Sequence, residues 1–300
     1  MATREIVNQD LEKVKVLCEK ILGGSYDEIE RMGGLTNHTY RVSVNRSQYY
    51  VVRIPGDGTE KLINRDDEKA STKLACKLGI DANCLYFGKD GSKVTEYIKG
   101  AVTMSSDTMK EERHIGQLAA IFQKLHQCGE DTGVAFEVFD MADGYEQIIY
   151  ENNVSMYDDY EAVKATVMEI KKSIDDSCII KKVPCHNDAL CENWVEDCDG
   201  RMYLIDWEYA GMNDALWDLA DVSIEAEYRD FEDELMLTEY LQRKPEELDW
   251  KHFLANKIYV DYLWMLWAKT RVPFDGQPME DWAVQRYTRL KDNIKKFTNI

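Results

Sequence analysis

The chain has 300 residues, 44% of them hydrophobic and 31% charged, a composition typical of a folded globular protein. Its formal net charge of -19 makes nucleic acid an unfavourable partner, because phosphate backbones are bound mainly by clustered lysine and arginine. The N-terminus lacks the apolar core of a signal peptide, and no run approaches the roughly 20 apolar residues of a membrane helix. We therefore expect a cytoplasmic protein without a membrane span, whose 8 cysteines are reduced.

The N-terminal part, residues 1–100, is predicted to form an antiparallel sheet with one inserted helix. Apolar residues recur at helical spacing from Leu11 to Ile21. The strand-like runs that follow are Tyr26–Met32, Thr39–Val44, Gln48–Ile54, Asn83–Phe87 and Lys93–Ile98. Before the fourth of these runs, Arg65–Leu78 has the pattern of a helix that ends at Gly79. We expect a lobe boundary at Gly100.

The C-terminal part, residues 101–300, is predicted to be mostly helical. One expected helix contains Ile115–Leu125. The others are expected to cover Met141–Tyr150, Tyr157–Asp175, Ala215–Glu227, Phe231–Gln242, Pro245–Lys269 and Glu280–Phe297. Pro245 suits a first helical turn, where its missing N–H is not required. The chain is thus predicted to be an α+β protein, with a sheet-containing N-terminal lobe and a mostly helical C-terminal lobe.

A central segment between these helices carries turn and strand signals. An apolar run, Met202–Ile205, is separated by a polar turn at Asp197–Gly200 from an earlier strand, which predicts a two-stranded ribbon. The ribbon would bring together the polar residues Asp188, Asn193 and Asp206 at one end. Phosphoryl transfer needs a group that acts on the acceptor hydroxyl and oxygen ligands that hold magnesium against the phosphates. These residue types supply both.

The motifs of this segment resemble those of a known kinase family. His186-Asn187-Asp188 with Asn193, followed by Leu204-Ile205-Asp206-Trp207-Glu208-Tyr209, is similar to the catalytic loop and metal-binding segment of the choline/ethanolamine kinases. This family lies within the aminoglycoside-phosphotransferase and protein-kinase-like superfamily, and the resemblance is strongest to the bacterial, LicA-type members. It extends over nearly the whole chain. The resemblance implies a two-lobed protein-kinase-like fold, with ATP and Mg²⁺ as cofactors.

The resemblance also implies roles for individual residues of the segment. Asp188 would act on the acceptor hydroxyl, while Asn193 and Asp206 would bind magnesium, with Glu208 as a further ligand. His186 would brace the loop. Farther along the chain, the pair Trp217-Asp218 is expected to anchor its helix against the catalytic core.

The N-terminal lobe is expected to bind the nucleotide. Gly33–Asn37 falls between two predicted strands, where glycine lets backbone N–H groups approach phosphates. The pattern alone is equally typical of a hairpin turn, but a similar segment covers the nucleotide in choline kinases. Arg53 occupies the strand position of the kinase lysine and is expected to pair with Glu68, unless it faces solvent. Glu96 and Ile98 lie where kinase-like folds hydrogen-bond adenine.

Large aromatic residues near the C-terminus are candidates for the acceptor site. Trp264 and Trp267 share a helical face, and aromatic residues at this spacing most often belong to a core. A quaternary ammonium has no N–H to donate, so aromatic faces and a nearby carboxylate are its physical recognition elements. The resemblance to choline kinases assigns Trp264, Trp267 and Trp282 to such a site, with Glu225 as its carboxylate.

The sequence therefore predicts an ATP- and magnesium-dependent kinase that phosphorylates the hydroxyl of choline. Ethanolamine, thiamine or an aminoglycoside are alternative acceptors on the same fold. A pseudokinase is disfavoured because Asp188, Asn193 and Asp206 are all present, and a protein kinase because A-P-E is absent and D-W-E replaces D-F-G. The expected partners are MgATP and a small amino alcohol, without nucleic acid.

Overall fold

The computed structural model describes residues 2–24, 26–33, 37–56 and 63–299. Two compact units make up the chain. The first unit consists of Met1–Met104 and Glu192–Ala210, and the second of Ser105–Cys191 and Gly211–Ile300. The lobe boundary at Gly100 stays a prediction.

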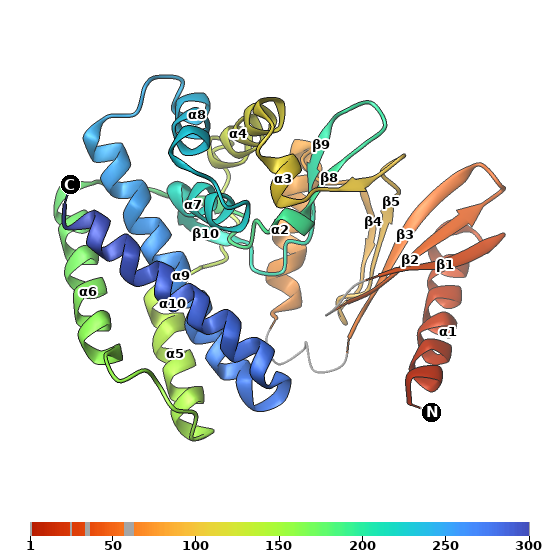
Figure 1. Ribbon diagram of the computed structural model, residues 1–300. Helices are drawn as coiled ribbons and strands as arrows, with labels where there is room; N and C mark the ends of the chain where they lie inside the picture. Colours follow the sequence, from red (N-terminus) through yellow and green to blue (C-terminus); the bar gives the residue numbers. More distant parts are fainter. Residues whose placement is uncertain (1, 25, 34–36, 57–62, 300) are drawn as a thin grey trace. The chain divides into compact units, whose positions relative to one another are not determined.

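The first unit contains a five-stranded antiparallel sheet in the order β1-β2-β3-β5-β4 (Figure 1). Its strands are β1 (Glu28–Gly33), β2 (Asn37–Val44), β3 (Gln48–Pro55), β4 (Cys84–Phe87) and β5 (Lys93–Glu96). Tyr40 is paired with Val52, and Val52 with Val94, so apolar side chains of three neighbouring strands are aligned on one face. The sheet predicted from the sequence is confirmed.

Helix α1 (Ala2–Leu22) covers this apolar face of the sheet. Val14, Leu17 and Cys18 are buried in one cluster with Tyr40 and Val52. Apolar residues at helical spacing and apolar residues at strand spacing thus meet in a single core. This packing gives the first unit a rigid base for the polar side chains of β2 and β3.

Helix α2 (Arg65–Leu78) has the bounds that the sequence predicts. The side chain of Asn64 accepts a hydrogen bond from the N–H of Asp66 and caps the first turn. Gly79 ends the helix in the left-handed region, with φ +62°, and its N–H points to the carbonyls of Ala75 and Cys76.

The predicted ribbon forms, and it belongs to a three-stranded sheet in the order β6-β8-β9. These strands are β6 (Val102–Thr103), β8 (Trp194–Glu196) and β9 (Met202–Leu204). Trp194 pairs with Leu204, which places Asn193 and Asp206 beyond the same end of the ribbon. The ribbon is tied to the N-terminal part of the unit by the N–H of Leu204, which donates to Ile80 O at 3.1 Å. Strand β6 had no signal in the sequence.

The second unit is mostly helical, as predicted. Its elements are α3 (Ser106–Met109), α4 (Glu112–His126), α5 (Val138–Glu151), α6 (Tyr160–Ser177), β7 (Lys182–Cys185), β10 (Gly211–Asp214), α7 (Ala215–Glu225), α8 (Asp230–Leu241), α9 (Glu247–Asp275) and α10 (Gln277–Phe297). Helix α9 is buried along most of its length, and α10 returns beside it (Figure 1). No helix of the described ranges is long and apolar enough to cross a membrane.

The bounds of α9 differ from those predicted for this helix. Pro245 lies outside it, because Glu246 is the N-cap and forms a capping box with Asp249. The helix also continues past Lys269 to Asp275 and includes Pro273. Proline is tolerated there because it removes a hydrogen bond only close to the helix end.

Gly79 provides a test of the α2 terminus. Gly79→Ala should lower the free energy of unfolding by about 1 kcal/mol, because an L side chain is strained at φ +62°. Gly116→Ala is the matched control: nothing lies within 4 Å of a Cβ at this position in α4, so the change should stabilise the protein by roughly 0.5–1 kcal/mol. Urea unfolding curves measure both variants. Equal stabilisation by the two substitutions would contradict the assigned conformation of Gly79.

Candidate active site

Arg53 is the centre of a buried charge cluster in the first unit. Its side chain lies in β3 and is 7% exposed, so the solvent-facing alternative is wrong. The guanidinium donates to the Glu68 carboxylate on α2, to Gly91 O at 3.2 Å, and to Asp206 Oδ1 at 3.1 Å. The structure thus brings together three residues that the sequence places far apart.

A second arginine completes the cluster. Arg65 Nη1 donates to Glu68 Oε2 and to Glu208 Oε1, both at 2.7 Å. Asn37 Nδ2 donates to the same Glu208 oxygen at 2.9 Å. Asn37 is the described end of the predicted phosphate-covering segment, whose residues 34–36 lie outside the described residues. Arginine and amide donors therefore fix the carboxylates from several sides.

The charges of the cluster stabilise one another. Burial disfavours the charged form of Arg53, but the carboxylates of Asp206, Glu68 and Glu208 outweigh this effect and raise the pKa of its guanidinium. Arg53 therefore stays a cation throughout the physiological pH range. A permanent cation beside the ribbon end suits a site for phosphate oxygens.

The carboxylates of this cluster have the chemistry of a magnesium site. Oxygen atoms of Glu68, Asp206 and Glu208 lie within 4.8 Å of one another, and such hard donors suit Mg²⁺. Glu68 is fully buried and bonded to both arginines, whereas the Asp206 side chain is 36% exposed. Asp206 also has φ +67°, a conformation that directs it away from the regular β9 backbone. The backbone oxygen of Asn193 accepts the N–H of Ile205 at 2.9 Å, so Asn193 lies beside the residue that precedes Asp206.

A pocket of about 220 Å³ opens next to Arg53 in the first unit. Its walls are largely apolar and include Val51, Ala101, Val195 and Ile205. Glu96 and Ile98, the predicted adenine-binding positions, both line it, as do Arg53 and Asp206. An apolar slot with charged groups at one end has the character of a nucleotide site.

Asp81 is a buried carboxyl in the wall of this pocket. It is 6% exposed; one oxygen accepts the N–H of Ala82 at 2.6 Å, while Oδ2 has no hydrogen-bond partner among the described residues. Burial raises its pKa to about 6, although the Lys93 ammonium acts in the opposite direction. Asp81 had not been singled out in the sequence.

In the second unit, the loop that carries Asp188 is held by a buried carboxylate of α7. Asp218 is fully buried and accepts the N–H groups of His186 and Asn187, both at 2.8 Å. Trp217 Nε1 donates to Asn187 O at 3.1 Å, which confirms the anchoring expected of this pair. Asn187 adopts φ +66°, and Asn213 Nδ2 donates to its side chain at 2.9 Å. The loop backbone is therefore fixed on both sides of Asn187.

A second carboxyl of α7 lies close to Asp188. Asp221 is fully buried, and its Oδ2 accepts the N–H of Ala189 at 2.5 Å. Burial raises its pKa well above the ordinary value, and the nearby charges of Glu225 and Asp188 raise it further. The charge of Asp188 also helps to raise the pKa of Tyr145 to about 12, although burial of the phenol is the larger cause. Asp188 thus lies among acidic and phenolic side chains.

The tryptophans predicted for the acceptor site form one cluster. The ring centroids of Trp264 and Trp267 are 6.2 Å apart, and those of Trp267 and Trp282 are 6.0 Å apart, with interplanar angles of 86° and 79°. Trp264 is 5% exposed and belongs to the core, whereas Trp267 and Trp282 are partly exposed. Glu225 reaches this cluster through Arg286, which pairs with its carboxylate and lies over the Trp282 ring.

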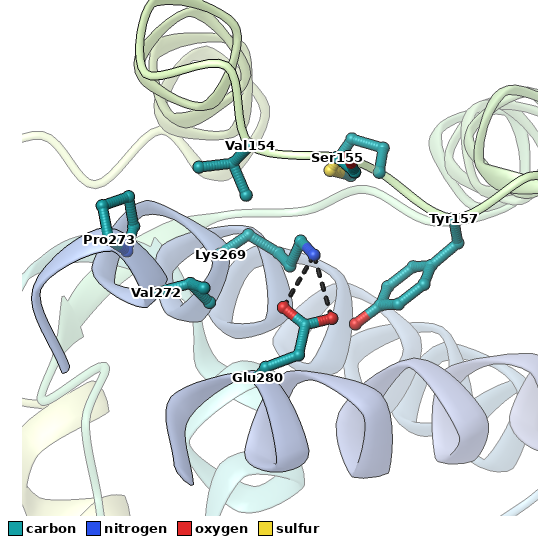
Figure 2. A pocket seen from close by; sticks show the side chains of 8 residues that line it. Val154, Ser155, Tyr157, Lys269, Val272, Pro273 and Glu280 are labelled. Atoms are coloured by element: carbon teal, nitrogen blue, oxygen red, sulfur yellow. Dashed lines mark hydrogen bonds and ion pairs between the residues drawn. The ribbon is translucent and has the colours of Figure 1, made fainter. Parts of the chain in front are cut away.

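A separate pocket of about 450 Å³ lies between α9, α10 and the α5–α6 connection (Figure 2). Lys269 Nζ is paired there with Glu280 at 2.8 Å and lies 4.9 Å from the centroid of the Tyr157 ring. None of the predicted site residues lines this pocket. Residues two positions apart on a helix face opposite sides, so Lys269 points away from the side on which Trp267 lies.

Residues 29–263 match the model of the family described as choline/ethanolamine kinase. The chain belongs to the choline/ethanolamine kinase family. It is therefore a nucleotide-binding phosphotransferase with an alcohol group as acceptor. Among the relatives, protein LicA of Haemophilus influenzae is 29% identical over 268 residues, which cover 85% of this chain and 76% of the relative.

Solved structures of this family share the fold. A choline/ethanolamine kinase family protein from Mesorhizobium loti superposes with a TM-score of 0.84 at 30% identity, covering 97% of this chain and 96% of the other. Choline kinase LicA from Streptococcus pneumoniae gives 0.79 at 32% identity, covering 95% and 99%. Aminoglycoside 2'-phosphotransferase-IIIa gives 0.65 at 14% identity and shares the fold alone. The family and the kinase-like fold expected from the motifs are confirmed.

Several buried polar residues of this choline/ethanolamine kinase-like chain were not anticipated. They are Arg65 and Asp81 in the first unit, and Asp221 and Arg286 in the second. Arg65 had a usable signal, since it lies three residues before Glu68 on a predicted helix. The others are recognised only by their tertiary partners.

The raised pKa of Asp81 predicts a pH-dependent stability. The unfolded carboxyl titrates near its ordinary 3.8 and the folded one near 6, so the folded state binds more protons between these values. This group therefore stabilises the fold at low pH, and its contribution is lost as the pH rises from about 4 to 6, by about 3 kcal/mol. Asp81→Asn should remove that loss and be more stable than wild type at pH 8, but not at pH 4.

Urea unfolding at several pH values checks this expectation. Asp199→Asn, at an exposed position of the ribbon turn, is the matched control and should leave the pH profile of wild type unchanged. Parallel profiles for wild type and Asp81→Asn would show that Asp81 is not the group responsible.

Proposed function

We propose that this kinase transfers the γ-phosphate of ATP to the hydroxyl of choline and forms phosphocholine. The observation that carries the choice of acceptor is the cluster of Trp267 and Trp282 beside Glu225, since aromatic faces and a carboxylate suit a quaternary ammonium. The likeness to choline kinase LicA of Streptococcus pneumoniae supports the same choice. Ethanolamine is the main competing acceptor.

In this proposal, Asp188 accepts the proton of the acceptor hydroxyl and orients its oxygen toward the γ-phosphate. The N–H groups of His186 and Asn187 donate to Asp218, and these hydrogen bonds hold the backbone of the loop that carries Asp188. Asp221 accepts the N–H of Ala189, and its pKa is raised well above the ordinary value, so it adds less negative charge near Asp188 than an ordinary carboxylate would. Asp188 is therefore the carboxylate available to the hydroxyl.

The nucleotide is proposed to occupy the pocket of the first unit. The adenine would lie between the apolar walls near Ile98, and Arg53 would face the phosphate oxygens. Asp206 and Asn193 would hold Mg²⁺, with Glu208 as a further ligand. A bound Mg²⁺ neutralises phosphate charge and thereby lowers the barrier to transfer. The ion pair with Glu68 keeps Arg53 in place.

A direct assay tests the proposal. Purified protein with MgATP is given choline, ethanolamine, thiamine or an aminoglycoside, and ADP release and the phosphorylated product are measured. Choline is expected to give the highest kcat/KM. A folded, nucleotide-binding protein that forms no phosphocholine would refute the assignment, and a higher kcat/KM with another compound would replace the acceptor.

Asp188→Asn tests the role of the loop carboxylate. The substitution should lower kcat by about 10²- to 10⁴-fold, the usual contribution of a positioned acid-base group, and leave nucleotide affinity unchanged. By contrast, Asp206→Asn should raise the Mg²⁺ concentration required for half-maximal rate. Steady-state kinetics with titrated Mg²⁺ separate the two effects. Full turnover by Asp188→Asn would exclude it from the chemistry.

Trp267→Ala tests the aromatic site. Loss of one desolvated aromatic face should raise the KM for choline by roughly 3- to 30-fold without changing the KM for ATP. Trp250→Ala is the matched control, since Trp250 is another partly buried tryptophan of α9, packed on Phe253 about 25 Å from Trp267 along the helix axis. It should leave both KM values unchanged. Equal changes in both KM values for Trp267→Ala would indicate that Trp267 only supports the packing.

A further inference from the structure

A buried cation already occupies part of the proposed acceptor site. The Arg286 side chain on α10 is 3% exposed, and its guanidinium carbon lies 4.0 Å from the centroid of the Trp282 ring. One Nη donates to the Glu225 carboxylate of α7, and the other to Asp261 Oδ1 of α9 at 3.3 Å. The guanidinium therefore joins three helices.

Asp261 holds this guanidinium in place. It is fully buried and binds Arg289 on its other side, with Nη2 at 2.6 Å and Nε at 2.8 Å. Removing either partner of such a buried pair leaves an uncompensated charge, so the contact is costly to break. Trp282 stacks on Arg286 one helical turn away in the same helix. These contacts make Arg286 a fixed part of the site rather than a mobile surface side chain.

The pairing determines what Glu225 can offer to a ligand. Of the two carboxylates that Arg286 binds, Asp261 is fully buried, whereas the Glu225 side chain is 17% exposed and is the more accessible one. Arg286 neutralises Glu225 and uses part of its capacity to accept hydrogen bonds. The positive charge of Arg286 also acts on Asp221 and lowers its pKa. Burial and the charges of Glu225 and Asp188 act in the opposite direction, and the pKa stays raised.

The two candidate acceptors differ in what they require from this carboxylate. A primary ammonium has three N–H donors, and each one left without an acceptor after desolvation costs free energy. A quaternary ammonium has no such donor and gains mainly from aromatic faces and diffuse charge. A site whose accessible carboxylate is already paired, but whose tryptophans Trp267 and Trp282 are partly exposed, therefore favours the methylated cation.

We propose that Arg286 determines the preference for quaternary over primary ammonium acceptors by occupying Glu225 and fixing Trp282. This role rests on the proposed function, because it concerns the same acceptor site. Arg286 is here a positioning and specificity-determining residue. It does not contact the reacting hydroxyl.

The first test uses wild-type protein and a series of acceptors with zero to three N-methyl groups, from ethanolamine to choline. Binding is measured without nucleotide by calorimetry and by tryptophan fluorescence. Affinity should rise with each methyl group. A flat or reversed series would overturn the proposal without any variant being made.

The second test uses Arg286→Met, which removes the donors but keeps a long apolar side chain. With Glu225 open to N–H donors, the ratio of choline to ethanolamine affinity should fall by about tenfold, the worth of one hydrogen bond to a charged group. Arg289→Met is the matched control on the same helix: it removes an arginine from Asp261 but leaves the Arg286 contacts with Glu225 and Trp282. It should lower stability and leave the ratio unchanged.

Turnover measured in parallel separates this inference from the proposed function. Binding that shows the methyl dependence without phosphocholine formation would refute the function and keep the role of Arg286. Phosphocholine formation with an unchanged affinity ratio in Arg286→Met would refute the role and keep the function. Should Arg286→Met unfold, the affinities of wild type for the methylated series decide whether the proposal stands. Arg286→Lys keeps a donor for Glu225 and should retain the preference of wild type for choline over ethanolamine.

Discussion

A buried carboxylate, Asp218, fixes the backbone of the loop that carries Asp188, the residue proposed to act on the acceptor hydroxyl. Its two oxygens accept the N–H groups of His186 and Asn187, so the loop before Asp188 has one permitted conformation. Desolvating a carboxylate is costly, and these charge-assisted hydrogen bonds are what make its burial tolerable. These bonds use the backbone of the loop, whereas in the proposed function it is the side chain of Asp188 that acts on the acceptor hydroxyl.

The two units bury charge in different ways. In the first unit, the carboxylates of Glu68, Asp206 and Glu208 are balanced by arginines, beside the proposed nucleotide pocket. In the second unit, Asp218 and Asp221 of α7 accept backbone N–H groups, while Glu225 and Asp261 are paired with arginines. In the proposed function, the phosphates would therefore meet fixed cations, whereas the acceptor would meet aromatic rings and acidic groups. This division follows the opposite charges of the two proposed substrates.

The local features of the fold were predictable from the sequence, because they depend on neighbouring residues. Helix α2 begins and ends where Asn64 and Gly79 indicate, and the five-stranded sheet follows from alternating apolar runs. Pro245 was misplaced because the capping pair Glu246 and Asp249 outweighs the general preference of proline for a first turn. Helix bounds are therefore reliable where a cap is unambiguous.

The site was predictable only in part, since motifs identify residues that act but not those that support them. Arg53 and Glu68 were expected as a pair and are found as one. Arg286 could not be recognised in the sequence, because its role depends on contacts with Glu225, Asp261 and Trp282, which belong to three helices. Likewise, β6 has two residues and forms only because β8 supplies a partner from much later in the chain.

That late pairing has a consequence for how the protein is made. A nascent chain that has left the ribosome only as far as Met104 has no β8 or β9, and it lacks Asp206 and Glu208, which are carboxylate partners of Arg53 and Arg65 in the folded protein. The first unit is completed only when Glu192–Ala210 has been synthesised, after the early helices of the second unit. Pairing two segments that are so far apart in the sequence is slow compared with forming local helices. The first unit is therefore expected to stay incomplete while α3–α6 of the second unit are synthesised, although most of its residues are encoded first.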